Sequence, residues 1–402
     1  MIQLPFGEPF SVMAKPVGSA CNLRCTYCYY LEKGKYYKTS DSHLMDDESL
    51  ETFIRQYIDS QPTKNVVFNW HGGEALLRPV SYYRKIMELE KKYGAGREIS
   101  NTIQTNGTLL TDEWCEFFKE NNFLVGVSID GPKHLHDKYR KRHDGTSSFD
   151  DVMEGIEMLN RHRVDWNVLA TVNAANADYP VETYNFLKSL GTPFLQFTPV
   201  VERIKRDGML AHQGDENVKL AEFSVKPQQW GKFMIGVFDE WVKSDVGEVY
   251  VQLFDATLAN KMGAQSPVCT MAEECGNALA VEFNGDVYSC DHFVFPRYKL
   301  GNIHKGALWQ MAMSPEQKRF SAKKKDSLPR KCRACEYLWA CHGECPRNRF
   351  VKTSEKGRYL NYLCDGYRAF FEHVSPAMDF MKRELDAGRP PANIMNVQPQ
   401  GD

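Results

Sequence analysis

The sequence has no uninterrupted apolar stretch near the ~18 residues that a membrane span requires. Its first ten residues, MIQLPFGEPF, lack the basic segment followed by an apolar segment that marks a secretory signal peptide. It also lacks an excess of either charge, because 50 Lys and Arg residues face 52 Asp and Glu residues, for a net charge of −2. So balanced a chain has no global attraction to nucleic acid or to an anionic membrane. We therefore expect a cytoplasmic protein that binds neither nucleic acid nor membranes.

Twelve cysteines are the unusual feature of an otherwise ordinary composition, with 42% hydrophobic and 25% charged residues. At roughly 100–200 residues per domain, the 402 residues predict two or three domains. Because the cytosol keeps thiols reduced, disulfides do not explain so many cysteines. Short intervals between cysteines instead favour metal ligation, because they bring several thiolates onto one ion or cluster. Eleven of the twelve gather in two regions, which are Cys21, Cys25 and Cys28, and then Cys269, Cys275, Cys290, Cys332, Cys335, Cys341, Cys345 and Cys364.

Short runs rich in β-branched and aromatic residues alternate with amphipathic segments over the first 200 residues. The expected strands are Phe10–Ala14, Val66–Trp70, Ser100–Gln104, Phe123–Ile129, Asp165–Val172 and Phe194–Pro199. The expected helices are one that follows the N-cap Asp46, then Tyr82–Tyr93, Asp112–Glu120, Phe149–Arg161, Val181–Leu190 and, farther on, Lys226–Lys243. Six such alternations predict an α/β fold, with a parallel sheet that is either open or barrel-like.

Polar and glycine residues recur where the expected strands end. The first cysteines follow strand one, His71-Gly72-Gly73-Glu74 follows strand two, and Thr105-Asn106-Gly107 follows strand three. Because α/β folds build their sites at the carboxyl ends of parallel strands, we expect the active site there. Residues 201–225 are polar and look like a loop or linker. Within Val281–Tyr288, the Asn284-Gly285 pair predicts the turn of a β-hairpin.

The first cysteines have the spacing C-x3-C-x2-C, formed by Cys21, Cys25 and Cys28. Three thiolates leave one iron of a four-iron cluster without a protein ligand, and that open position can take a substrate or cofactor. The alternative is a structural zinc site completed by a distant histidine.

This motif resembles that of the radical S-adenosylmethionine (SAM) enzymes. Gly72-Gly73-Glu74 is similar to the glycine-rich segment that follows strand two in that family. The resemblance implies a [4Fe-4S] cluster whose open iron chelates SAM, with Gly73 where the backbone meets the SAM amino group. A glycine suits such a position because the missing Cβ lets a ligand approach the backbone.

The eight later cysteines could form two four-thiolate zinc sites. Their spacing, however, closely resembles the SPASM extension, which holds two auxiliary [4Fe-4S] clusters. By that resemblance, the first auxiliary cluster has the ligands Cys269, Cys275, Cys290 and Cys345, and the second has Cys332, Cys335, Cys341 and Cys364.

Within that group the chain is most similar to the anaerobic sulfatase-maturating enzymes. The stretches that carry the similarity are Cys28-Tyr29-Tyr30, Gln104-Thr105-Asn106-Gly107-Thr108, Phe123-Leu124-Val125-Gly126-Val127-Ser128, Phe194-Leu195-Gln196-Phe197 and Cys290-Asp291. The resemblance implies a partial (β/α)6 barrel followed by a cysteine-rich SPASM domain with a β-hairpin and helices. We expect a radical SAM core at 1–225, a linking helical segment at 226–264, the SPASM domain at 265–375, and a helix end with a tail at 376–402.

The same resemblance places five residues against SAM, which are Tyr27, Gly73, Ser128, Arg140 and Leu195. It makes Asp291 the general base beside the substrate. Without the resemblance, Asp291 would be a turn residue, and Arg140 part of a solvated basic stretch. Relatives often have Gln before Gly72-Gly73-Glu74, whereas this chain has His71. This difference puts only a secondary contact at that position in doubt. We expect Cys115 to be a buried apolar residue. His342 could ligate a metal, but because the thiolates already complete two sets we expect it to lie beside the ligands or to be structural.

The resemblance implies oxidation of an active-site Cys or Ser in an unfolded or nascent sulfatase polypeptide to Cα-formylglycine. SAM cleavage would give a 5′-deoxyadenosyl radical that takes hydrogen from the substrate Cβ. Asp291 would accept a proton, and an auxiliary cluster the remaining electron. A low-potential donor such as a flavodoxin or ferredoxin would supply electrons. The alternatives are another SPASM-type peptide-modifying enzyme, for example one that forms thioethers, and a non-catalytic zinc-binding protein.

Overall fold

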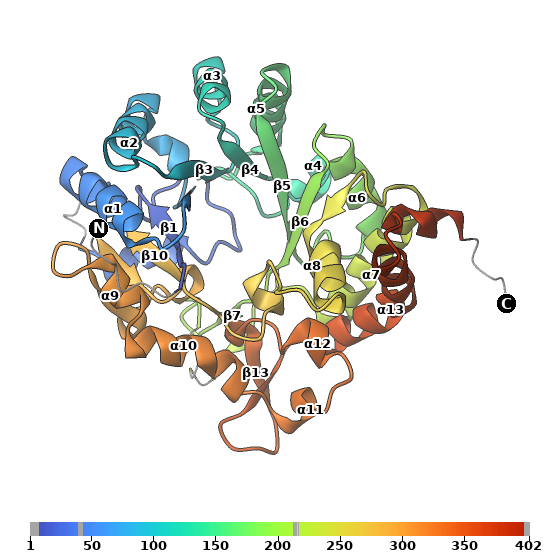
Figure 1. Ribbon diagram of the computed structural model, residues 1–402. Coiled ribbons are helices and arrows are strands. Elements are labelled where there is room, and N and C mark those ends of the chain that lie inside the picture. The colour runs from blue at the N-terminus through green and yellow to red at the C-terminus, as the bar shows by residue number, and fades with distance from the viewer. Residues whose placement is uncertain (1–7, 39–42, 212–214, 216, 398–402) are drawn as a thin grey trace. The chain divides into compact units, whose positions relative to one another are not determined.

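The computed structural model describes residues 8–38, 43–211, 215 and 217–397. The chain forms two compact units, each assembled from separate segments (Figure 1). The first unit contains Met1–Ser128, Arg140–Trp166 and Gly276–Ala322, and the second contains Ile129–Tyr139, Asn167–Cys275 and Lys323–Asp402. The domain boundaries expected from the sequence stay a prediction.

A mostly parallel sheet forms the centre of the first unit. Strands β10, β1, β2, β3 and β4 are neighbours in that order and parallel, and antiparallel β11 and β12 extend the sheet beyond β10. The strands are β1 Ser11–Lys15, β2 Asn65–Trp70, β3 Glu98–Thr105, β4 Leu124–Ser128, β10 Ala278–Glu282, β11 Asp286–Tyr288 and β12 Lys299–Asn302. The helices are α1 Asp47–Ser60, α2 Val80–Tyr93, α3 Asp112–Glu120, α5 Phe149–Arg161 and α9 Leu308–Ala312, with short η1 Leu31–Tyr36, η2 Ala75–Leu77, η4 Asp291–Phe293 and η5 Pro296–Tyr298. Figure 1 shows α1, α2 and α3 on the outer side of these strands.

Local chemistry explains where these elements begin and turn. The Asp46 carboxylate accepts a hydrogen bond from Ser49 N at 2.7 Å, which satisfies one of the unpaired amides at the start of α1. The buried face of α1 carries Phe53 and Tyr57, whose rings pack against Phe68 of β2. At the hairpin between β10 and β11, Gly285 has a φ of +80°, a conformation that a glycine adopts at little cost.

The second unit also alternates strands with helices. Its parallel strands lie in the order β5, β6 and β9, with bounds Asp165–Val172, Phe194–Pro199 and Tyr250–Val251. Two short antiparallel pairs are β7 Arg203–Ile204 with β8 Lys219–Leu220, and β13 Arg349–Lys352 with β14 Tyr359–Asn361. The helices are α4 Lys133–His136, α6 Pro180–Lys188, α7 Pro227–Ser244, α8 Gln252–Lys261, α11 Arg330–Arg333, α12 Leu338–Cys341 and α13 Cys364–Asp386, with η3 Cys269–Met271, η6 Pro346–Asn348 and η7 Pro391–Asn396. Helix α10, Pro315–Asp326, begins in the first unit, and its last residues belong to the second.

The predicted alternation of six strands with helices, followed by a hairpin, is confirmed. Four elements match their expected bounds to the residue, which are α3, α5, β5 and β6. The loop expected over residues 201–225 is wrong in part, because β7 and β8 pair there over two residues each, too short a run to show periodicity. Among the described helices, none has the length and apolar character needed to pass through a bilayer.

Candidate functional site

The first cysteine motif lies in the loop that follows β1. Leu23 N donates to Cys21 Sγ at 3.4 Å, and Asn106 Nδ2 approaches the same sulfur at 3.8 Å. Burial raises the pKa of Cys21 to about 12. A coordinated metal ion would offset that penalty, because a thiol that coordinates a metal is deprotonated. The hydrogen bonds to sulfur already suit a metal-bound thiolate.

The glycine-rich segment after β2 is tied to this cysteine loop through the backbone. Gly73 N donates to Gly18 O and Glu74 N donates to Ala20 O, both at 2.8 Å. The fully buried Glu74 carboxylate accepts from Thr105 Oγ1 at 2.8 Å and from Asn106 N at 2.7 Å. The ends of β1, β2 and β3 are therefore held together, as the placement of polar residues after the strands predicts.

Gly73 has a structural role besides the expected contact with SAM. A Cβ at this position would lie 1.9 Å from the carbonyl oxygen of Ala20, the residue before Cys21. That oxygen belongs to the backbone, so the side chain of another residue cannot make room by rotating. Any larger residue at position 73 must displace the loop that carries the first cysteines.

We expect Gly73→Ala to lower the iron content from about twelve to about eight per chain, because only the first of three four-iron clusters is disturbed. Calorimetry should show that SAM binding is lost with it. Gly306→Ala is the matched control, since a Cβ there meets only Met311 Cε at an ordinary 3.5 Å. A Gly73→Ala protein with full iron and the SAM affinity of the control would contradict this role.

The other residues expected to contact SAM differ in their surroundings. Arg140 is 7% exposed and donates to the Tyr27 hydroxyl at 2.9 Å, so it does not lie on a solvated face. Ser128, at the end of β4, accepts from Gln104 Nε2 at 3.0 Å. Leu195 is buried on β6 in the second unit. The structure places Tyr27, Arg140 and Ser128 in the first unit, and their roles toward SAM stay predictions.

Asp291, the first residue of η4, is held from both sides. Its Oδ1 forms an ion pair with Lys15 Nζ at the end of β1, and its Oδ2 accepts a hydrogen bond from the Tyr29 hydroxyl at 2.7 Å. Lys15 is fully buried and its Nζ also lies 3.3 Å from His71 Nδ1. The carboxylate is therefore fixed in orientation, which an ordinary turn residue at a hairpin end is not.

The electrostatics of this group favour an ionised Asp291. Burial by itself would raise the pKa of the Asp291 carboxyl, but the ammonium group of Lys15 holds it well below its usual range. Burial and the neighbouring Lys15 lower the pKa of His71 to about 4, so its imidazole is neutral at pH 7. Burial raises the pKa of Glu282 to about 7, and Tyr30 donates to that carboxyl. A negative oxygen is thus available to accept a proton.

The sequence analysis missed Lys15 as a part of this site. Its one indication is a lysine at the end of an otherwise apolar strand, where a charge is costly unless it is paired. The partner lies 276 positions away, so no local pattern reveals it. Tyr29 is part of the Cys28-Tyr29-Tyr30 similarity, but its contact with Asp291 is visible only in the structure.

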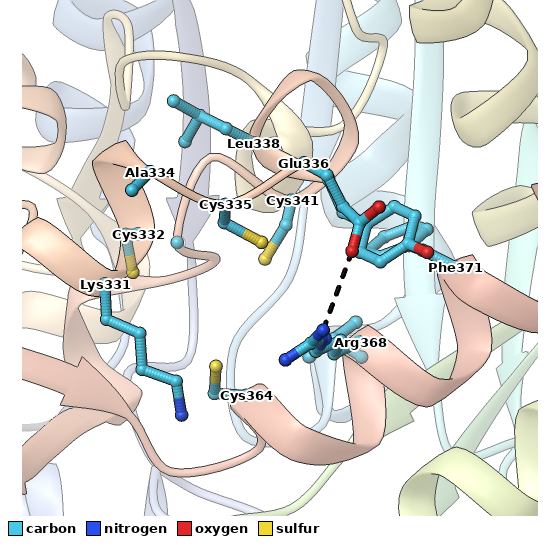
Figure 2. A pocket seen from close by; sticks show the side chains of 13 residues that line it. Lys331, Cys332, Ala334, Cys335, Glu336, Leu338, Cys341, Cys364, Arg368 and Phe371 are labelled. Atoms are coloured by element: carbon cyan, nitrogen blue, oxygen red, sulfur yellow. Dashed lines mark ion pairs between the residues drawn. The ribbon is translucent and has the colours of Figure 1, made fainter.

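Four of the later cysteines line one cavity of about 220 Å³, Cys332, Cys335, Cys341 and Cys364. They come from α11, α12, the segment between them and the start of α13, and Figure 2 shows their sulfur atoms directed into a common space. Tyr367 and Phe371 close the cavity with apolar surface. Among the described residues, no three His, Cys, Asp or Glu side chains are grouped as ligands of a single ion. Thiols that surround a space in this way fit a four-iron cluster.

The ligand set expected for the first auxiliary cluster is divided between the units. Cys269, Cys275 and Cys345 lie in the second unit and Cys290 in the first. Their joint ligation therefore stays a prediction. The described cysteines are thiols and not disulfides. Cys115 is fully buried in α3, as predicted, and burial raises its pKa to about 11.

Comparison with known proteins agrees with these features. A family model of the radical SAM superfamily matches residues 16–187, and one of the iron-sulfur cluster-binding SPASM domain matches residues 269–336. A solved structure of native anSMEcpe with bound AdoMet and Cp18Cys peptide superimposes with a TM-score of 0.83 at 30% identity, covering 94% of this chain and all of that one.

Two curated relatives extend over nearly the whole chain. The cysteine-type anaerobic sulfatase-maturating enzyme of Clostridium perfringens is 31% identical, over 92% of this chain and 97% of its own length. The serine-type anaerobic sulfatase-maturating enzyme of Bacteroides thetaiotaomicron is 57% identical, over 99% of this chain and 97% of its own length. Identity of this extent shows that the chain belongs to the anaerobic sulfatase-maturating enzymes, which are radical SAM enzymes with a SPASM domain.

Proposed function

We propose that this enzyme oxidises an active-site Ser or Cys of a sulfatase polypeptide to Cα-formylglycine, with Asp291 as the proton acceptor. The observation that carries the proposal is the Asp291 carboxylate, which Lys15 keeps ionised and Tyr29 keeps oriented beside Cys290. The family membership, shown by 57% identity along the chain, supports the reaction.

The cofactors of this family are three [4Fe-4S] clusters and SAM. We propose that Cys21, Cys25 and Cys28 hold the cluster that binds SAM. The second auxiliary cluster fits the cavity formed by Cys332, Cys335, Cys341 and Cys364, and the first is assigned to Cys269, Cys275, Cys290 and Cys345. When bound, SAM and the cluster held by Cys21, Cys25 and Cys28 supply the radical that takes a hydrogen atom from the substrate Cβ.

The chain itself orients the substrate and accepts its proton. A hydroxyl or thiol becomes more acidic once its carbon has lost a hydrogen atom, which favours transfer of its proton to a neighbouring carboxylate. Asp291 then takes that proton on a carboxylate oxygen, while Lys15 stabilises the negative charge before the transfer. The remaining electron would pass to an auxiliary cluster, and the thioaldehyde formed from a Cys substrate would be hydrolysed by water. Positioned proton acceptors of this kind typically contribute about 10²–10⁴-fold to the rate of their step.

We further propose a low-potential flavodoxin or ferredoxin as the electron donor and the cytoplasm as the compartment. The spacing of the cysteines, typical of cluster ligands, supports that compartment, because ligation needs the reduced thiols that the cytosol maintains.

Anaerobic incubation with SAM, a reductant and peptides that bear a C/S-x-P/A-x-R motif tests the proposed function. The relative with 57% identity is of the serine type, so a serine peptide is the first substrate, a cysteine peptide the second, and an alanine peptide the control. We expect mass spectrometry to find an aldehyde, captured by a hydrazide reagent, on the first two. A thioether-forming enzyme would yield a product that the hydrazide does not capture, and a zinc protein would leave all three peptides unchanged.

A further inference from the structure

Arg349, the first residue of β13, is a buried cation whose donors all meet backbone or side-chain oxygens. The residue is 3% exposed. Its Nε donates to Gly343 O at 2.8 Å, its Nη2 to His342 O at 2.9 Å and Glu344 O at 3.0 Å, and its Nη1 to Lys324 O at 2.5 Å and Ser327 Oγ at 3.3 Å. A guanidinium is always charged in proteins, so these contacts fix a permanent positive charge inside the second unit.

The loop that faces this guanidinium has an uncommon backbone. His342, Gly343 and Glu344 all have positive φ, at +46°, +72° and +51°. Two of the three are not glycine, and such residues adopt this left-handed conformation only at an energetic cost. The three carbonyls of this strained turn all accept hydrogen bonds from Arg349, so its guanidinium holds the turn in this conformation.

The same loop joins the two proposed auxiliary ligand sets. Cys341, just before it, belongs to the second set, and Cys345, just after it, belongs to the first. Burial lowers the pKa of Arg349, and the carboxyl of Glu344 and the thiols of Cys332, Cys345 and Cys341 act in the opposite direction. Gly343, whose carbonyl accepts from Arg349 Nε, also lines the cavity of the second set. Arg349 is therefore bound to the loop that connects a proposed ligand of each cluster.

Lys324 is a second buried cation, and its ammonium group binds the backbone at Cys269 of the first auxiliary set. It is fully buried, and its Nζ donates to the carbonyls of Cys269, Thr270 and Ala272. Three simultaneous donations require the three hydrogens of an ammonium group, so the side chain is charged. Burial lowers the pKa of Lys324, and the thiols of Cys275, Cys269 and Cys345, all of the first auxiliary set, act in the opposite direction together with Glu344.

One carboxyl group, that of the buried Glu344, raises the pKa of both buried cations. Burying a charge costs free energy unless a group of opposite sign accompanies it. A four-iron cluster with four thiolate ligands is anionic, and it gains one more negative charge when it is reduced. Clusters at these cysteines would supply the missing countercharge.

We propose, resting on the proposed function, that Arg349 and Lys324 are positioning residues whose charges raise the reduction potentials of the auxiliary clusters. Arg349 acts on both clusters, and Lys324 acts on the one ligated by Cys269, Cys275 and Cys345. A cation beside a cluster stabilises the added electron, and net charge around a cluster is one of the factors that set its potential. The two residues thereby make these clusters better electron acceptors.

The test is an EPR-monitored redox titration of the reconstituted full-length chain with Cys21, Cys25 and Cys28 replaced by Ala, so that only auxiliary clusters contribute. In that background Arg349→Met should lower the equilibrium constant for reduction of both clusters at least about tenfold, which is about 59 mV for a one-electron couple. Arg349→Lys, which keeps the charge, should shift it far less. Lys324→Met should lower the reduction potential of the first auxiliary cluster only. Lys324→Arg, which keeps the charge, should leave that potential near the parent value.

Arg358→Met is the matched control. Arg358 also donates to two carbonyls of the second unit, those of Asp326 and Leu328, but its side chain is 35% exposed. Equal shifts in the charge-keeping and neutral variants, or unchanged potentials with full iron, would overturn the inference. So would loss of iron from both neutral variants, which would assign the cations to folding. An absence of iron from the parent chain would instead contradict the proposed function itself.

Discussion

Replacing Asp291 with Asn should lower formylglycine formation by about 10²–10⁴-fold while 5′-deoxyadenosine still accumulates. Asn keeps the size of the side chain and its hydrogen bond from Tyr29, but it does not accept a proton. SAM cleavage depends on the first cluster, so it should continue. The two products, measured in the same anaerobic reaction, should therefore fall to very different extents.

Because Asp291 forms an ion pair with the buried Lys15, the test of Asp291 needs a second variant. Lys15 is fully buried, so Asp291→Asn leaves its charge without this partner, at a typical cost of about 3–5 kcal/mol in folding free energy. The double variant Lys15→Met, Asp291→Asn removes both charges and should recover thermal stability without recovering activity. Recovered formylglycine in the double variant would mean that Asp291 serves only to neutralise Lys15.

Asp365→Asn is the matched control for position. Asp365 also directly follows a proposed cluster cysteine, Cys364, but its side chain is 67% exposed and its ion pair with Lys331 is long, at 3.6 Å. It should retain wild-type formation of both products. A parallel fall of both products in Asp291→Asn would place the aspartate before radical formation and contradict its role as base.

Replacing Cys21, Cys25 and Cys28 together by Ala should abolish SAM cleavage and lower the iron content from about twelve to about eight per chain. The second ligand set explains why eight irons remain, since its four cysteines line a cavity of their own within the second unit. Cys115→Ala is the control, because Cys115 is buried in α3 and should leave iron unchanged. Full iron in the triple variant, or stoichiometric zinc in the wild type, would contradict the cluster assignment.

Local patterns in the sequence predicted most of the strands, the helices and the cysteine motifs. The N-cap Asp46, the helix periodicity of α3 and the Asn284-Gly285 turn are all encoded within a few residues. Such features are accessible because neighbouring positions decide them. The resemblance to a family then supplied the roles, which spacing alone left open between iron and zinc.

Long-range contacts of buried charges escaped prediction for a physical reason. Lys15 and Asp291, or Arg349 and the carbonyl of Lys324, meet only after the chain folds. A lysine in a strand and an arginine after a cysteine loop are common on surfaces, so neither residue indicates burial by itself. The close approach of Gly73 to Ala20 was not predicted either. The sequence predicts that a ligand approaches Gly73, and the structure shows that the backbone of Ala20 lies against it as well.

The most direct test of the central claim uses a serine peptide that carries deuterium at Cβ. Incubated anaerobically with the reconstituted enzyme, SAM and a reductant, it should yield formylglycine together with 5′-deoxyadenosine that contains one deuterium per aldehyde formed. That equality would show hydrogen abstraction at the carbon that this enzyme oxidises. Cleavage of SAM with no deuterium in 5′-deoxyadenosine, or a peptide recovered without an aldehyde, would contradict the account.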